Sequence, residues 1–348
     1  DSLAIYDCQF WNYKQKQQKG DKYSFVLENN GKEVTVNVGN LKHGLRNITI
    51  DGKKGEYEAI TSSTLPDYPT KDSRKGFVDS GYDPTDSVTI VGWLKDMPEQ
   101  AWQRGREFSV ALNDFFKTSE EDEYTKVDSL GRFCLKMSLL NSSQAFIDWE
   151  HTTASSVLEP GKTYFLLNDF KKGQKLWMGD DVRLQNELLS YPHTWEQVRI
   201  NYGENVKIDA MMHWAQTDSL RNKQTEELRQ LLAAHPNLSE RYVDYIKGYH
   251  QNLQINSMMS AGFYTTLPQE YMDYVTQELW LKAPKPYTLY RDFVDRKTFY
   301  LNQLIGNSED NDIVAALKRY EQEGRLTLSE EEKNLASQYQ TEMKQVMA

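Results

Sequence analysis

Glycine is distributed unevenly along this chain, and the distribution limits what each part can fold into. Residues 1–203 hold 15 of the 19 glycines, whereas residues 204–348 hold only Gly248, Gly262, Gly306 and Gly324. Glycine supplies the positive φ angles that tight turns need, and it weakens helix interiors. The first part is therefore predicted to be turn-rich β structure, and the second part is predicted to be helical.

Alternating apolar residues flank short turns near the N-terminus. Segments 23–27 and 34–38 stand on either side of Asn30-Gly31, and segment 47–50 is followed by Asp51-Gly52. Asn-Gly or Asp-Gly between alternating segments is a strong hairpin signal. We predict consecutive β-hairpins in residues 1–80.

A second group of short apolar segments follows a linker rich in proline and glycine over residues 61–86. The predicted strands are 88–94, 108–112, 132–139, 145–149, 156–158 and 164–167. Short strands at this spacing, joined by turns, favour an antiparallel sandwich over parallel units with crossover helices. We assign this sandwich-like domain to residues 85–176.

From about residue 179 the apolar residues recur at helical intervals, and about six helices are expected. Ser329 and Glu332 have the spacing of a capping box at the start of the last helix. The predicted fold class is α+β, with a small β unit in residues 1–80, the sandwich in 85–176 and a helical domain in 177–348.

Composition excludes several partners. Aromatic residues make up 12% of the 348 residues, which is typical of a folded chain. The net charge of −10 and the lack of any cluster of five basic residues argue against a nucleic-acid partner. The longest stretch without Asp, Glu, Lys or Arg, residues 248–269, carries too many amides and hydroxyls for a transmembrane span. No signal peptide is visible, because the N-terminus lacks a basic start and an apolar run; since the chain starts at Asp1 rather than Met, we expect that it has been processed and that its targeting segment has been removed.

Local motifs of catalysis are missing from the sequence. It contains no Cys-x-x-Cys, no His-Glu-x-x-His, no Gly-x-Ser-x-Gly and no Gly-x-Gly. Asp79, Asp83 and Asp86 lack calcium-loop spacing, so a solvated linker is favoured there over a calcium site, and the acidic run Glu120 to Glu123 is predicted to be a solvated loop. The sequence therefore predicts no catalytic residue, no cofactor and no metal.

The two cysteines, Cys8 and Cys134, are 126 positions apart. The spacing favours two isolated thiols. A structural disulfide is the alternative if the chain is secreted, and a catalytic cysteine is the least favoured of the three.

Two sets of residues are candidates for a docking surface. Met258 and Met259 lie in the uncharged segment, for which complete burial is the favoured reading. Trp149 and His151 lie near a predicted strand end, where packing is again favoured over binding.

Three stretches, in this order and spacing, resemble one protein family. They are Asp128-Ser129-Leu130-Gly131-Arg132-Phe133, then Leu158-Glu159-Pro160-Gly161-Lys162-Thr163-Tyr164-Phe165-Leu166, then Trp177-Met178-Gly179 with Asn186-Glu187-Leu188. The chain resembles the region that precedes the thioredoxin domain in TlpA-like envelope thiol–disulfide oxidoreductases of the gram-negative lipoprotein type. The resemblance covers residues 85–348, and the first 80 residues fit it less specifically.

The resemblance implies a C-terminal thioredoxin domain, with Trp-Cys-x-x-Cys, downstream of this chain. It also implies export to the periplasm or outer envelope, with a lipid anchor on the removed N-terminus. No position of the chain matches a catalytic residue of the family. The expected function is therefore a non-catalytic accessory or positioning region, whose partners are its own thioredoxin domain and envelope client proteins, acting in cell redox homeostasis. The alternative is a stand-alone envelope binding protein for a glycan or a peptide.

Overall fold

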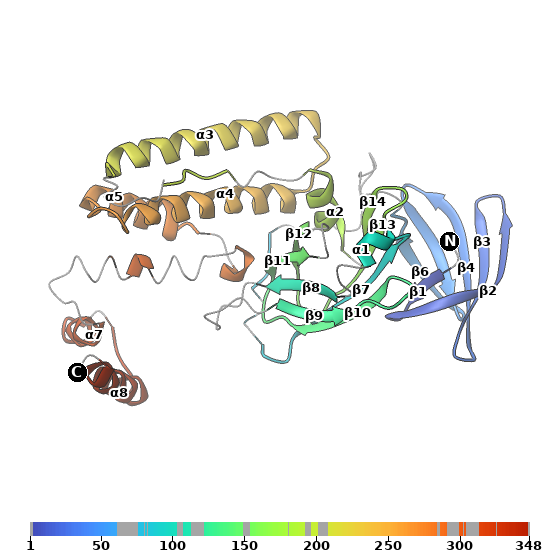
Figure 1. Ribbon diagram of the computed structural model, residues 1–348, viewed down its shortest axis with the longest axis horizontal. Coiled ribbons are helices and arrows are strands. Elements are labelled where there is room, and N and C mark those ends of the chain that lie inside the picture. Colours follow the sequence, from blue (N-terminus) through green and yellow to red (C-terminus); the bar gives the residue numbers. More distant parts are fainter. Residues whose placement is uncertain are drawn as a thin grey trace. The chain divides into compact units, whose positions relative to one another are not determined.

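The fold is antiparallel β structure followed by helices, as the glycine distribution predicts (Figure 1). A computed structural model describes residues 3–60, 76–79, 81, 83–102, 107–112, 122–148, 154–179, 181–191, 196–200, 208–283, 286–290, 299–301, 303, 313–324 and 326–346.

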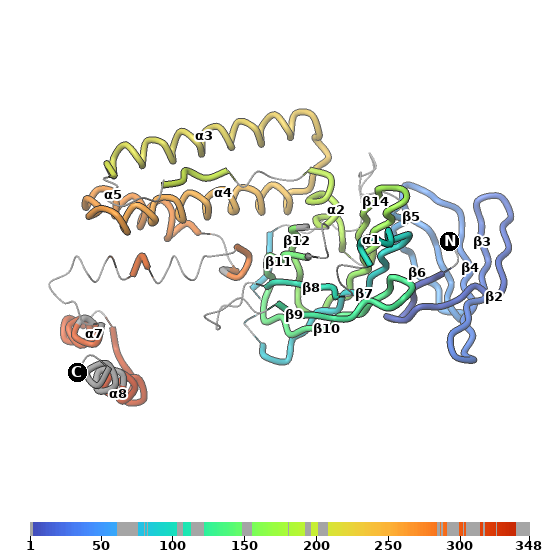
Figure 2. Tube along the Cα trace, viewed as in Figure 1, coloured from blue at the N-terminus to red at the C-terminus, as the bar shows by residue number. Residues whose placement is uncertain are grey.

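The N-terminal strands form one six-stranded sheet in which each strand pairs with its chain neighbours (Figure 2). They are β1 Leu3–Tyr6, β2 Gln9–Lys19, β3 Lys22–Asn29, β4 Lys32–Lys42, β5 Leu45–Ile50 and β6 Lys53–Glu58. Both predicted hairpins are confirmed, because Asn30 and Gly31 link β3 to β4, and Asp51 and Gly52 link β5 to β6, all with positive φ. Two positive φ angles in a row make the turn whose twist matches that of the flanking strands.

The six-stranded sheet has a small buried core, and its two edge strands disfavour pairing with other molecules. Only Trp11, Leu27 and Val34 form its buried centre among the described residues, with partly buried side chains around them. The edge strand β1 has four residues, and the edge strand β6 reads Lys-Lys-Gly-Glu-Tyr-Glu. Short or charged edge strands discourage pairing with another chain.

Two four-stranded sheets follow. Their strands are β7 Ser87–Lys95, β8 Glu107–Leu112, β9 Asp122–Lys126, β10 Arg132–Ser138, β11 Ser143–Asp148, β12 Ala154–Leu158, β13 Thr163–Asp169 and β14 Gln174–Gly179. The strand orders are β10-β7-β13-β14 and β12-β11-β8-β9. One buried cluster takes residues from both sheets, including Ile90 of β7, Phe108 of β8 and Ile147 of β11. The sheets therefore pack face to face, which confirms the sandwich.

The sandwich differs from the prediction in three strands. β13 runs parallel to β7, whereas all other pairs are antiparallel in the described sheets. The chain passes through the second sheet between these two strands, so no hairpin fixes their direction. β9 was not expected because its acidic start suggests a solvated loop, and β14 was not expected because its pattern is short and close to the first helix.

Helices make up most of the rest of the described chain. They are α1 Glu99–Trp102, α2 Arg183–Ser190, α3 Ala210–Ala234, α4 Glu240–Ala261, α5 Gln269–Tyr274, α7 Ile313–Gln322 and α8 Glu330–Val346, with a π-helix at Val275–Trp280 and a 3₁₀-helix at Tyr287–Leu289. The capping box of α8 is confirmed: the Ser329 hydroxyl accepts from the Glu332 backbone N–H at 3.2 Å, and the Glu332 carboxylate accepts from the Ser329 N–H at 2.7 Å.

The chain divides into two compact units. The first comprises residues 1–197, 219–253 and 283–291, and the second comprises residues 198–218, 254–282 and 292–348. The core of the second unit is a cluster around Met258, Tyr271 and Val275. Among the described helices, none combines the length and the apolar character that crossing a membrane requires. The division at residues 80 and 177 stays a prediction.

Buried polar contacts join the elements of the first unit. The Asn186 side chain of α2 accepts from the Trp177 backbone N–H and donates to the Trp177 carbonyl, at 2.9 Å each, so it completes the edge of β14. The Glu187 carboxylate accepts from Ser239, whose hydroxyl in turn caps the Tyr242 N–H at the start of α4. The buried Arg241 donates to the Glu159 carboxylate at 3.0 Å and to the Gly76 carbonyl at 2.9 Å.

Candidate functional site

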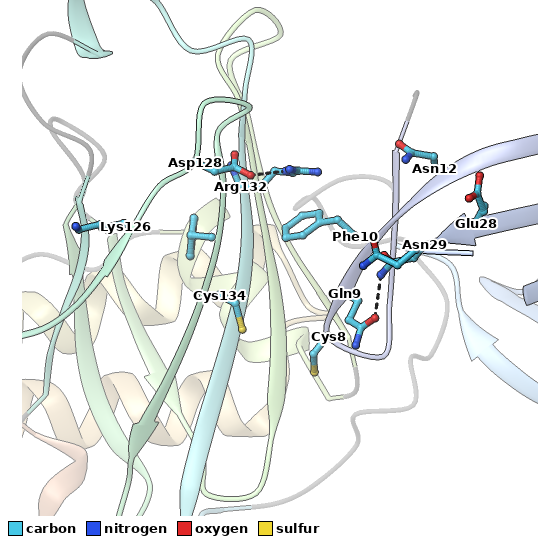
Figure 3. Close-up of a pocket in the computed structure, with 12 residues that line it drawn as sticks. Cys8, Gln9, Phe10, Asn12, Glu28, Asn29, Lys126, Asp128, Arg132 and Cys134 are labelled. Atoms are coloured by element: carbon cyan, nitrogen blue, oxygen red, sulfur yellow. Dashed lines mark hydrogen bonds and ion pairs between the residues drawn. The ribbon is translucent and has the colours of Figure 1, made fainter. Parts of the chain in front are cut away.

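An open, polar depression of about 720 Å³ lies within the first unit (Figure 3). One wall consists of residues from the β1–β2 and β3–β4 hairpins, and the other consists of residues from β9, β10 and the turn between them. The lining residues are Cys8, Gln9, Phe10, Asn12, Glu28, Asn29, Asn30, Lys126, Asp128, Arg132, Phe133 and Cys134.

The hairpin wall begins with a strained turn. Tyr6 and Gln9 face each other across β1 and β2, so Asp7 and Cys8 alone make the turn, with φ of 49° and 56°. Such angles suit Asn or Gly and are uncommon for cysteine. The Trp11 indole N–H donates to the Tyr6 carbonyl at 2.9 Å, which ties the turn to the buried centre of the sheet. The turn places the Cys8 thiol at the edge of the depression.

The opposite wall is organised by Asp128. Its carboxylate accepts from the backbone N–H groups of Leu130 and Arg132 at 2.9 Å and from the Arg132 guanidinium at 2.7 Å. Partial burial opposes ionisation of this carboxyl, but the three donors outweigh it and hold the pKa of Asp128 below its usual value. The carboxylate thus fixes the β9–β10 turn and the Arg132 side chain.

The two walls touch through a cation–π contact. The Arg132 guanidinium lies over the Phe10 ring, 5.2 Å from its centroid. An exposed contact of this kind contributes about 0.5–1 kcal/mol. Arg132 is two residues before Cys134 on β10, and Phe10 is two residues after Cys8, so the contact holds the two cysteine-bearing segments beside one depression.

The thiols occupy opposite walls of the depression (Figure 3). Cys8 is half-buried, and its Sγ lies 4.0 Å from the Thr163 hydroxyl of β13. Cys134 is exposed on the outer face of β10. Across the sheet it pairs with Val91 of β7, which in turn pairs with Phe165 of β13, so these three residues form one cross-strand row. Burial of its sulfur, followed by the nearby Cys8, raises the pKa of the Cys134 thiol. Both cysteines are free thiols.

The charges that line the depression balance. Lys126 and Arg132 are basic, and Glu28 and Asp128 are acidic. The remaining polar lining is dominated by side-chain amides, and the Asn29 amide donates to the Gln9 amide oxygen at 2.9 Å. Amides offer both donors and acceptors. The depression is therefore suited to a neutral polar ligand, such as a peptide backbone or a sugar, rather than to a strongly charged one.

The predicted site residues have different outcomes. Cys8 and Cys134 are brought to one depression. Met258 and Met259 are completely buried in the core of the second unit, so they do not form a surface for docking. The predicted burial of the uncharged segment is confirmed at these two residues, but it does not extend to Phe263, whose side chain is exposed. Trp149 and His151 lie outside the described residues.

The amides of the depression were missed by sequence reasoning. They belong to strand ends and turns whose composition is ordinary, and the contact between the walls spans more than 100 residues. The described residues contain no group of three His, Cys, Asp or Glu side chains that would suit a metal. Asp79 and Asp83 of the linker instead accept hydrogen bonds from Gly81, Asn141 and Thr85.

Comparison with protein-family models, with characterised proteins and with solved structures finds no match to this chain.

Proposed function

We propose that this chain is a non-catalytic recognition and positioning region of a thioredoxin-like thiol–disulfide oxidoreductase of the cell envelope, acting in the periplasm or at the outer envelope. A thioredoxin unit is small and reacts with many disulfides, so added surface beside it improves the choice of client. Tethering keeps that surface at high effective concentration.

The observation that carries the non-catalytic role is the environment of Cys134. A thiol that attacks disulfides is typically activated by a lowered pKa, usually at a helix N-terminus or beside a cation. Burial raises the pKa of Cys134, and the residue lies in the middle of strand β10. The depression is lined by two basic and two acidic residues, of which Arg132 and Asp128 form an ion pair, so its lining carries no net positive charge.

The stretches that carry the family resemblance support the proposal through their structural roles. Asp128 fixes the β9–β10 turn, Gly161 has the positive φ of the turn before β13, and Asn186 completes the edge of β14. Each stretch therefore contributes a turn or an edge contact to this β–helix architecture. Because the matching residues form turns and strand edges, the resemblance concerns the fold, and no catalytic residue can be inferred from it.

Insulin reduction tests the non-catalytic role. With dithiothreitol as the electron donor, the chain alone should not speed the precipitation of reduced insulin above the rate with dithiothreitol, while added thioredoxin should speed it. A thiol-dependent acceleration that Cys8→Ser and Cys134→Ser each abolish would reject the proposal. The reading frame downstream of codon 348 is an independent test: a thioredoxin domain with Cys-x-x-Cys is expected there.

A stand-alone envelope binding protein for a glycan or a peptide is the second candidate. The amide-lined depression favours it, since amides and the partly covered Phe10 ring are the groups that bind sugars and peptide backbones. A stop codon directly after codon 348, together with saturable binding of an oligosaccharide that Asn12→Ala weakens, would support this candidate over the first.

A further inference from the structure

The chain contains only two cysteines, and folding brings both to one open depression. They are far apart in sequence, so their approach is a property of the folded first unit. The two cysteines belong to different elements: Cys8 lies in the two-residue turn between β1 and β2, and Cys134 lies in the ladder between β10 and β7.

We propose that Cys8 and Cys134 form a redox modification site, at which a small disulfide of the glutathione class converts the two thiols to an intrachain disulfide. The bond would join the N-terminal six-stranded sheet covalently to the outer face of the sandwich. The inference does not depend on the proposed function.

The reaction needs no oxidant beyond the small disulfide. The Cys8 thiolate attacks one sulfur of the reagent, whose S–S bond breaks and releases one thiolate. The Cys134 thiolate then attacks the Cys8 sulfur of the mixed disulfide and releases the second. In total, the two protein thiols lose two electrons and two protons, and the reagent gains them as two free thiols.

The geometry sets one requirement on the protein. Thr163, which Cys8 contacts, lies on β13, two strands away from Cys134 on β10. Thr163 lies in the row of Thr89 and Lys136, two residues along the strand from the row of Val91 and Cys134. Two strand spacings and two residues together amount to about 12 Å, whereas the Cα atoms of a disulfide lie within about 7 Å of each other. The Asp7–Cys8 turn must therefore move by a few ångströms along the outer face of β7. The row that leads to Cys134 runs through Phe165 and Val91, and Val91 is completely buried, so the moving turn must displace the atoms that cover it.

The test is oxidation of the intact chain in a buffer of oxidised and reduced glutathione, followed by peptide mapping without reduction. We expect a species lighter than the reduced chain by two hydrogen atoms, in which tryptic peptides 1–14 and 133–136 are joined. It should form at least about tenfold faster in the folded chain than in the same chain in urea, because folding raises the effective concentration of one thiol at the other.

The single variants provide matched controls. Cys8→Ser and Cys134→Ser should each form a glutathione adduct at the remaining thiol and no cross-link. The cross-linked chain should also unfold at a higher urea concentration than the reduced chain. Two glutathione adducts on the wild-type chain, disulfide-linked dimers, or a cross-link that forms no faster in the folded chain would each overturn the proposal. Insulin turnover would reject the proposed function and leave the cross-link standing.

Discussion

Two turn glycines of the sandwich have nearly the same backbone angle but different surroundings. Gly131 has φ of 80°, and a Cβ there would lie 2.2 Å from the Leu94 carbonyl oxygen. Gly161 has φ of 73°, and a Cβ there would meet no atom within 4 Å. The Leu94 N–H donates to the Gly131 carbonyl at 2.7 Å, so neither backbone can retreat without loss of that bond.

We therefore predict that Gly131→Ala is the more damaging of the two substitutions. Gly161→Ala should lower the free energy of unfolding by about 1–2 kcal/mol, the cost of a left-handed angle for an L-residue. Gly131→Ala should lower the free energy of unfolding by the same amount and by about 1–3 kcal/mol more, because the Leu94 carbonyl must move to make room for the methyl group. Urea unfolding followed by tryptophan fluorescence measures both. Equal losses would show that the β9–β10 turn accommodates the added methyl group.

At the scale of elements, α2 and α4 are joined by a carboxylate that is itself buried. Glu187 accepts from the Ser239 N–H at 2.8 Å and from its hydroxyl, and Ser239 caps α4. Burial raises the pKa of Glu187, even though Ser239 and Arg183 favour its ionised form. The folded chain therefore holds this proton more tightly than the unfolded chain does.

The sign of the pH dependence follows from linkage. As pH rises above about 4.3, the ordinary glutamate pKa, the unfolded chain loses the proton first, so the contribution of Glu187 to stability falls until pH passes the raised folded pKa. The stability of the wild type relative to Glu187→Gln should decline across that window and then level off. Urea unfolding at a series of pH values measures it, with the exposed Glu227→Gln as the control. A relative stability that increases with pH would contradict the raised pKa.

The hairpins and several strands were predictable because their signals are local. Asn30-Gly31 and Asp51-Gly52 specify their turns within four residues. β2 was not predicted as a long strand because its second half, Lys14 to Lys19, is almost wholly polar, and it is held by pairing with β3 rather than by its own pattern. The depression was beyond sequence reasoning, because turns that are individually ordinary meet there across more than 100 residues.

At the scale of the whole molecule, Arg241 connects three parts of the first unit. From α4 it bonds to Glu159 in the turn after β12 and to Gly76 in the linker, and its guanidinium lies over the Phe77 ring at 4.2 Å. Its side chain is 2% exposed, so the ion pair is screened little by solvent.

Removing Arg241 should strongly destabilise the first unit. Arg241→Met should lower the free energy of unfolding by about 3–5 kcal/mol, because the buried Glu159 carboxylate loses the guanidinium that donates to it. Far-UV circular dichroism and tryptophan fluorescence should report the same shifted urea midpoint.

The exposed Arg229→Met is the control and should leave the midpoint unchanged. The double variant Glu159→Leu/Arg241→Met should regain part of the loss, since no charge then remains buried. A double variant that is less stable than Arg241→Met would show that the Arg241 contacts with Gly76 and Phe77 outweigh the ion pair.

The charged rim of the six-stranded sheet has a consequence for crowded surroundings. With so few side chains in its centre, this sheet is expected to open more often than the sandwich. The edge strand β1 is short, and the edge strand β6 carries lysines and glutamates. During such an opening, these edges are poor templates for β-pairing with a neighbouring molecule. The N-terminal sheet can therefore open and close without starting intermolecular aggregation. The Cys8 thiol at the end of this sheet can become exposed during an opening with little risk of aggregation.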